Sequence, residues 1–188
     1  MHLEIIIAST RQNRKGKAVA DWFFEKASEY PGFEVGVTDL AELNLPPFDE
    51  PGHPRFQNYV YDHTKNWSNI VSAADAVCFV LPEYNSGFPA AFKNAIDYLH
   101  KEWAYKSIGF ISYGGVSGGL RAVHMAKSIL IQLRAFPVVE GVVIPFVDQM
   151  VNADGEFIPN DVTASAVKPM LDEMYRVAKA LEQLRVAS

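Results

Sequence analysis

The stretch Ala76-Val77-Cys78-Phe79-Val80-Leu81 is an unbroken apolar run that is closed by Pro82. Short apolar runs without alternation are typical of a strand that is buried on both faces, as in a parallel sheet covered by helices. Pro89 stands at the favoured first position of the next helical pattern, which predicts a helix over 89–99. The stretch therefore indicates one strand–loop–helix unit of an α/β fold, with the loop 82–88 at the carboxyl end of the strand.

The same order of strand and helix recurs along the 188 residues of the chain. Further strands are predicted over 3–8, 33–38, 107–112 and 137–144, and further helices over 18–30, 67–74, 120–133 and 162–184. Residues 44–63 form a long connection, and residues 145–160 an irregular segment. Five such alternations predict a five-stranded parallel sheet with helices on both faces. We expect residues 1–188 to be a single domain.

Composition and charge narrow the class of protein. The net charge of −5 argues against a nucleic-acid-binding face. No apolar run approaches the roughly 18–20 residues that span a bilayer, and residues 1–10 lack the basic region of a secretory signal. Cys78 is the one cysteine, so no internal disulfide is possible. These features predict a cytoplasmic protein with no membrane partner.

In open parallel sheets, ligands bind outside the carboxyl ends of the strands, which makes the loops 9–16, 82–88 and 112–119 the candidate site. The loop 9–16 leads into a helix, whose first N–H groups and dipole favour phosphate, and it adds hydroxyls and arginines. It does not fit the Walker spacing, and by itself it could be only a helix cap. The candidate phosphate ligands are Ser9, Arg11, Asn13, Arg14, Lys15 and Gly16.

The other two loops suit a flat aromatic ligand. Tyr84 and Phe88 offer aromatic surface, while Asn85 and the surrounding backbone offer polar groups for the edge of a flavin ring. The glycines of the loop 112–119 allow close approach of the backbone, although the loop does not match G-x-G-x-x-G. Each loop alone could be an ordinary turn, but three at one sheet edge favour a joint site. Its candidates are Pro82, Glu83, Tyr84, Asn85, Ser112, Tyr113, Gly114 and Gly115.

Three motifs resemble the NADPH-dependent FMN reductase family, a flavodoxin-like group that includes quinone, azo-dye and chromate reductases. They are Ala8-Ser9-Thr10-Arg11-Gln12-Asn13-Arg14, the segment 81–97 that begins Leu81-Pro82-Glu83-Tyr84-Asn85, and Ser112-Tyr113-Gly114-Gly115 with Gly118-Gly119-Leu120-Arg121. The resemblance implies a flavodoxin-like three-layer sandwich. It implies that Ser9, Arg11 and the turn through Gly16 hold the FMN phosphate, and that the other two loops line the flavin ring. Ala8 stands where the family usually has glycine.

The resemblance also implies the activity. We expect NAD(P)H to deliver hydride to N5 of bound FMN and then to leave, so that a quinone, azo compound, chromate or free flavin takes its place. No side chain is expected to act as a catalytic acid or base, and no metal is expected. The family commonly forms homodimers or homotetramers, and the segments 44–63 and 145–160 are candidates for walling the pocket or touching a neighbour. The sequence does not choose between NADPH and NADH.

Three alternatives share this topology. A flavodoxin-type electron carrier would typically have a hydroxyl-rich phosphate loop and stronger acidity, whereas this loop carries Arg11 and Arg14. A signalling receiver domain would need an acidic pair where Ser9 and Thr10 stand. A phosphatase would need a cysteine in a phosphate loop, whereas Cys78 lies within a predicted strand. The reductase is therefore the preferred interpretation, and the electron carrier is its main competitor.

Overall fold

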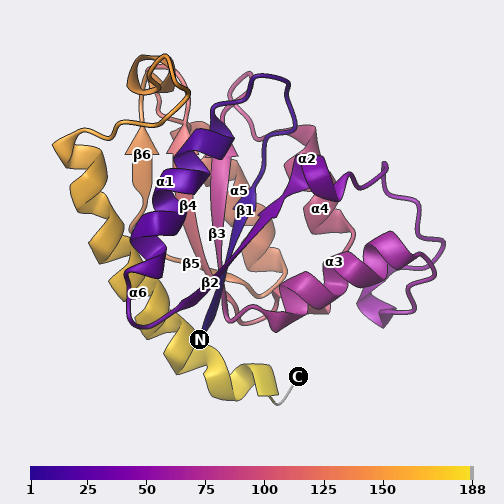
Figure 1. The fold of residues 1–188 in the computed structure, drawn as a ribbon. Helices are drawn as coiled ribbons and strands as arrows, with labels where there is room; N and C mark the ends of the chain where they lie inside the picture. The colour runs from indigo at the N-terminus through magenta and orange to yellow at the C-terminus, as the bar shows by residue number, and fades with distance from the viewer. Residues whose placement is uncertain (187–188) are drawn as a thin grey trace.

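The computed structural model describes residues 1–186, which contain one six-stranded sheet of order β2-β1-β3-β4-β5, with β6 also paired to β4. All of its strand pairs are parallel, so the strands end at a common edge, where the loops gather (Figure 1). The strands are β1 (His2–Ile7), β2 (Glu34–Asp39), β3 (Ala76–Pro82), β4 (Ser107–Tyr113), β5 (Phe136–Pro137) and β6 (Val142–Ile144). The prediction of an α/β fold with a parallel sheet is confirmed.

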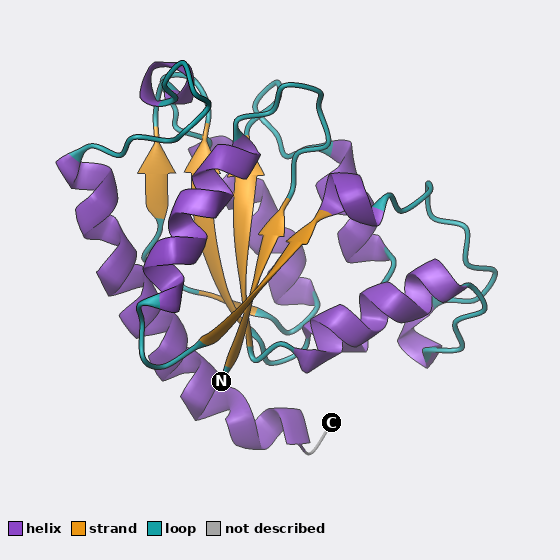
Figure 2. Cartoon of the chain, in the orientation of Figure 1, coloured by secondary structure: helices purple, strands orange, loops and turns teal. Residues whose placement is uncertain are grey.

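Helices cover both faces of the sheet and make three layers (Figure 2). One face carries α1 (Gly16–Ser28) and α6 (Asp161–Val186), and the other carries α3 (Asp62–Ala73), α4 (Ala90–Asp97) and α5 (Leu120–Gln132). The short helix α2 (Leu40–Leu43) follows β2, and 3₁₀ turns occur at Pro54–Phe56, Lys101–Trp103 and Val147–Met150. None of the helices in residues 1–186 combines the length and the apolar character needed to cross a membrane.

Successive side chains of β3 point to opposite faces of the sheet and belong to two separate cores. Cys78 and Val80 pack with α1 and α6, while Phe79 and Leu81 pack with the helices of the opposite face. Every residue of β3 is buried, as expected for a central strand between two helical layers. The unbroken apolar run thus supplies one row of side chains to each core.

The predicted fifth strand over 137–144 is interrupted in the structure. Ile108 pairs with Pro137 and Ile111 pairs with Val142, so the edge strand spans two more residues than β4 between these pairs. Pro137 has no N–H for the ladder, and Val139 is 88% exposed in the resulting bulge. β5 and β6 therefore share the position of one edge strand.

The connection after α2 is held by two buried carboxylates. Glu50 accepts hydrogen bonds from the N–H groups of Val60 and Tyr61 at 2.9 and 3.1 Å. Glu102 accepts hydrogen bonds from Gln57 and Tyr59 of this connection at 3.1 and 2.8 Å, and from Ser68 at 2.8 Å. α3 begins at Asp62, five positions before the predicted helix, so the irregular part of the connection is shorter than the sequence suggested.

Candidate functional site

The three predicted loops meet at the carboxyl ends of β1, β3 and β4 around a cavity of about 250 Å³. Its volume lies just below the range of roughly 300–1,000 Å³ that is usual for ligand pockets. The cavity can therefore enclose one end of a large cofactor while the rest lies against the rim. It is lined by Ser9, Arg11, Asn13, Arg14, Lys15, Pro82, Glu83, Tyr84, Tyr113, Gly114, Gly115, Val147 and Asp148.

The first loop is tied to the second through Tyr84. The Ser9 hydroxyl is fully buried and lies 2.6 Å from the Tyr84 hydroxyl, within hydrogen-bond distance. The Arg11 guanidinium stands over the Tyr84 ring, 5.6 Å from its centroid, in the geometry of a cation–π contact. Tyr84, from the loop predicted to line the ring, therefore positions Ser9 and Arg11, which are predicted to bind the phosphate.

The positive charges of the first loop differ in their partners. Arg14 forms an ion pair with Asp39, at the end of β2, while its Nε atom is buried without a hydrogen-bond partner. Arg11 and Lys15 form no ion pair with any carboxylate of residues 1–186. The cavity therefore presents Arg11 and Lys15, which form no ion pair, and Arg14, which is paired with Asp39; the carboxylate of Asp148 lines the same cavity.

Tyr113 places a hydroxyl against the start of α1. A Cβ atom added to Gly16 would lie 2.5 Å from this hydroxyl, so only glycine allows the close approach. The hydroxyl is buried, and no group of residues 1–186 makes a hydrogen bond of standard geometry with it. Burial and the neighbouring Tyr84 raise the pKa of Tyr113, whereas a contact from the Ser9 hydroxyl, outside standard hydrogen-bond geometry, and the charge of Arg14 lower it. The site thus holds a protonated, unsatisfied donor at a helix N-terminus.

The second loop turns back through a two-residue hairpin. Tyr84 and Gly87 exchange two backbone hydrogen bonds of 2.8 and 3.0 Å. Asn85 and Ser86 between them both have positive φ, at 50° and 66°, as a type I′ turn requires. This geometry puts Asn85 at the exposed tip of the hairpin, where its side chain does not line the cavity.

The third loop is joined to the second by Glu83. Its carboxylate accepts hydrogen bonds from the Ser117 hydroxyl at 2.9 Å and from the Arg121 N–H at 3.1 Å, and it pairs with the Arg121 guanidinium at 2.6 Å. Burial acts to raise the pKa of Glu83, but these hydrogen bonds hold it below its ordinary value. Glu83 is therefore ionised at neutral pH.

Most of the predicted site residues line this one cavity. Gly16 and Ser112 do not line it: Gly16 packs on Tyr113, and Ser112 is only 1% exposed. Val147 and Asp148 also line it, and they come from the segment 145–160 that the sequence analysis named as a possible wall. No local motif marked these two positions. They are brought in by hydrogen bonds from Phe146 and Val147 to the glycine loop. The connection 44–63 contributes no lining residue.

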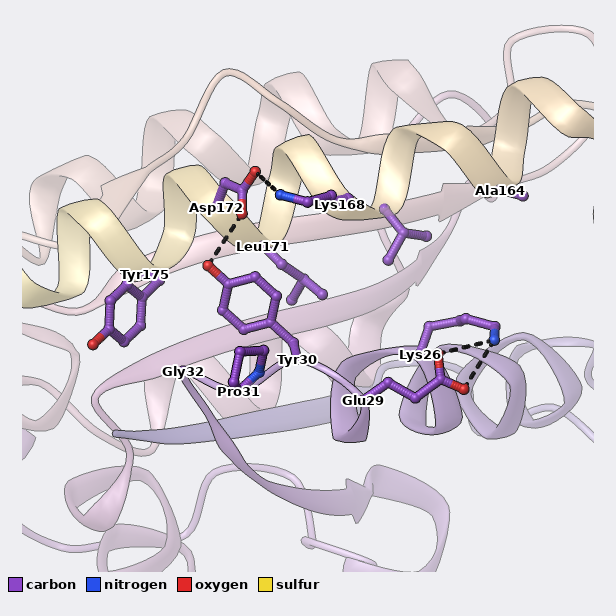
Figure 3. Close-up of a pocket in the computed structure, with 11 residues that line it drawn as sticks. Lys26, Glu29, Tyr30, Pro31, Gly32, Ala164, Lys168, Leu171, Asp172 and Tyr175 are labelled. Carbon is purple, nitrogen blue, oxygen red and sulfur yellow. Dashed lines mark hydrogen bonds and ion pairs between the residues drawn. The ribbon is translucent and has the colours of Figure 1, made fainter.

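A larger hollow of about 650 Å³ lies between the end of α1 and α6, away from the three loops (Figure 3). Its polar groups satisfy one another: Lys26 pairs with Glu29 at 3.1 Å, and Asp172 bonds Lys168 at 2.7 Å and Tyr30 at 3.1 Å. No cluster of three or more potential ligands able to hold a metal ion occurs in residues 1–186.

Comparison with known proteins connects this arrangement to one family. A family model described as NADPH-dependent FMN reductase matches residues 1–149. An NAD(P)H-dependent FMN reductase of Schizosaccharomyces pombe is 34% identical over 146 residues, which cover 75% of this chain and 72% of that protein. A quinone reductase of Pseudomonas putida is 36% identical over 135 residues, which cover 69% of each chain.

Among solved structures, the chain is similar to FerB of Paracoccus denitrificans, a flavoenzyme NAD(P)H:(acceptor) oxidoreductase. The TM-score is 0.76 at 20% identity, and the match covers 95% of this chain and 97% of that one. At this identity the likeness shows the flavodoxin-like fold and nothing finer.

Proposed function

Because the chain belongs to the NADPH-dependent FMN reductase family, we propose that the cavity between its three loops holds FMN. Membership of this family makes the chain an NAD(P)H-dependent oxidoreductase with FMN as its cofactor. The observation that carries the proposal for the site is the buried, unpartnered hydroxyl of Tyr113 at the start of α1.

The groups around that hydroxyl fit a phosphate. The first turn of a helix offers free N–H groups and the positive end of a dipole. Ser9 adds a hydroxyl, and Arg11 and Lys15 add charges that form no ion pair with a carboxylate of the described chain. Hydrogen bonds to an ionised ligand are stronger than those between neutral groups. A dianionic phosphate would therefore satisfy donors that are otherwise buried or unpaired.

The ring of the cofactor would lie between the second and third loops. Pro82 and Tyr84 of the second loop line the cavity together with Gly114 and Gly115 of the third. Within residues 1–186, the backbone N–H groups of Asn85, Ser86, Gly115 and Val116 form no hydrogen bond. They would donate to the polar edge of the ring and favour negative charge there. When bound, FMN supplies the redox chemistry, taking hydride from NAD(P)H and passing electrons to an acceptor.

We propose a small quinone or azo compound as the acceptor. The relatives include proteins named quinone reductase and azoreductase, which supports a flat, electron-poor molecule. The rim beside the glycine loop is apolar, because Val116 is 75% exposed and Leu120 is 42% exposed. A flat acceptor could pack on this surface after the nicotinamide leaves.

The oligomeric state, the domain organisation and the location of the protein are also proposals. We propose that residues 1–188 form one domain that works in the cytoplasm as a homodimer or homotetramer. Exposed apolar side chains on α5, such as Met125 and Ile131 at 46% and 58%, support a face between copies. Light scattering after gel filtration should give two or four times the 20.9 kDa mass of the chain. A monomeric mass would refute the oligomer.

The test of function begins with the purified protein reconstituted with FMN. Flavin absorbance bands that bleach within seconds of anaerobic NADPH or NADH addition are expected, followed by recovery when a quinone is added. Comparing the two nucleotides at equal concentration decides the nucleotide preference. Bound flavin that neither nucleotide reduces would restore the electron-carrier interpretation. Absence of FMN binding would refute the proposed site.

A further inference from the structure

Both carboxylate oxygens of Glu83 accept hydrogen bonds from the glycine loop and α5. Oε2 accepts hydrogen bonds from the Ser117 hydroxyl at 2.9 Å and the Arg121 N–H at 3.1 Å, while Oε1 accepts from Arg121 Nη1 at 2.6 Å. The Glu83 side chain is only 8% exposed, whereas that of Arg121 is 56% exposed. The Glu83 carboxylate therefore has no oxygen left without a protein donor, and it does not act as a free acid or base beside the cavity.

The position of this carboxylate also suits its charge. Arg121 is the second residue of α5, so its N–H is one of the helix donors that lack an intrahelical partner. A negative charge at a helix N-terminus is favourable. Glu83 thus caps α5 from a different loop, 38 residues earlier in the chain.

Backbone hydrogen bonds also hold the glycine loop to the segment 144–147: Gly114 donates to Ile144, and Gly115 accepts from Phe146. Gly118 and Gly119 have φ of 58° and 87° and are packed tightly against Val143 and the backbone of Tyr113. A Cβ atom at Gly115, by contrast, would meet nothing within 4 Å. In the described chain, the contacts of Glu83 with Ser117 and Arg121 are the side-chain hydrogen bonds that join the second loop to the third.

We infer that Glu83 is a positioning residue, whose bonds to Ser117 and Arg121 set the separation of the two loops that flank the FMN ring. This inference rests on the proposed function, because it concerns the same cavity. The carboxylate acts through the loop and not by touching the cofactor. Loss of these bonds removes the side-chain link between the two loops, while backbone hydrogen bonds still hold the glycine loop to the segment 144–147. The N–H groups of Gly115 and Val116 then shift relative to the second loop.

A double-mutant cycle with Glu83→Gln and Arg121→Gln tests the inference. We expect each variant to raise the dissociation constant for FMN about 10-fold or more, since each breaks a charge-assisted hydrogen bond. The double variant should bind FMN no more weakly than Glu83→Gln, because that variant weakens every bond of the carboxylate, whereas Arg121→Gln removes only the guanidinium bond. Arg121→Lys, which keeps a cation beside Glu83, should restore part of the affinity. Fluorescence titration of the apoprotein measures all four, and the midpoint potential of the bound flavin should move in both single variants.

Glu173→Gln is the matched control, because Glu173 pairs with Arg176 on α6, away from the three loops. It should leave FMN affinity and potential unchanged. If the double variant binds FMN much more weakly than Glu83→Gln alone, the two side chains act independently and the positioning role is wrong. If Glu83→Gln fails to fold, Arg121→Gln decides the question, because its side chain is largely exposed. Wild-type protein that binds no FMN would overturn the proposed function itself, whereas unaltered binding by both variants would overturn only this inference.

Discussion

Replacing Tyr113 by phenylalanine should move stability and cofactor affinity in opposite directions. The hydroxyl is buried without a hydrogen-bond partner, and leaving such a group unsatisfied costs about 1–3 kcal/mol. Tyr113→Phe removes only that oxygen and keeps the ring, so we expect the apoprotein to gain about 1 kcal/mol in free energy of unfolding. If the hydroxyl donates to the FMN phosphate, its loss removes a bond to a charged group worth about 1.5–3 kcal/mol. The dissociation constant for FMN should then rise about 10- to 150-fold.

Urea denaturation of the apoprotein and fluorescence titration with FMN measure the two effects separately. Tyr98→Phe is the matched control, because its buried hydroxyl donates to Asp49 at 2.8 Å and so has a partner. That variant should lose about 1 kcal/mol of stability and bind FMN normally. A Tyr113→Phe apoprotein that is less stable than wild type, with unchanged FMN affinity, would refute the reasoning on both counts.

Three further predictions follow from particular positions. Gly119→Ala should lower the urea midpoint and weaken FMN binding, because φ is 87° and the new Cβ would lie 2.8 Å from the Tyr113 nitrogen. Gly155→Ala is the control: its φ is 84° and the space around it is open, so it should lower the free energy of unfolding only by the backbone strain of about 1 kcal/mol. Burial and the nearby Arg185 lower the pKa of Lys106 from 10.5 to about 8. Burying the charged ammonium therefore lowers the free energy of unfolding by its full amount below pH 8, and this penalty vanishes toward pH 10.5. Relative to Lys106→Met, the wild type should therefore gain about 3 kcal/mol across that range in urea titrations, and a constant difference would contradict this. Burial acts to raise the pKa of Glu102, but hydrogen bonds from Gln57 and others hold it below 4.5, so Glu102→Gln should cost about 2 kcal/mol at pH 7. That difference should shrink as the pH falls below 4.5, and melting curves at pH 7 and pH 4 would show whether it does.

The fold was predictable because its signals are local. The apolar run 76–81 has the composition of a doubly covered strand, and the structure buries all of β3. The edge strand was predicted less well. Its apolar pattern over 137–144 is continuous, but Pro137 and the bulge that follows split it into β5 and β6. Periodicity reports which residues favour a strand, and it does not report where an edge strand leaves its ladder.

For the site, too, local sequence signals predicted some features and missed others. The motifs pointed to the three loops and to the family, and the family match confirms the family. Glu83 was predicted to line the flavin ring; in the structure it lines the cavity, and its carboxylate oxygens accept hydrogen bonds from Ser117 and Arg121. Arg14 was named as a phosphate ligand, and the structure also pairs it with Asp39. Val147 and Asp148 line the cavity without any motif of their own.

The sequence by itself determined the order of strands and helices, the edge of the sheet at which the loops gather and the family of the chain. These properties follow from periodicity, turn residues and motifs, each of which spans a few neighbouring positions. Only the tertiary structure decided which polar groups satisfy one another across the loops and which, like the Tyr113 hydroxyl, are left without a partner. The physical reason is that a hydrogen bond depends on distances of about 3 Å between residues far apart in the chain, and no local pattern encodes them.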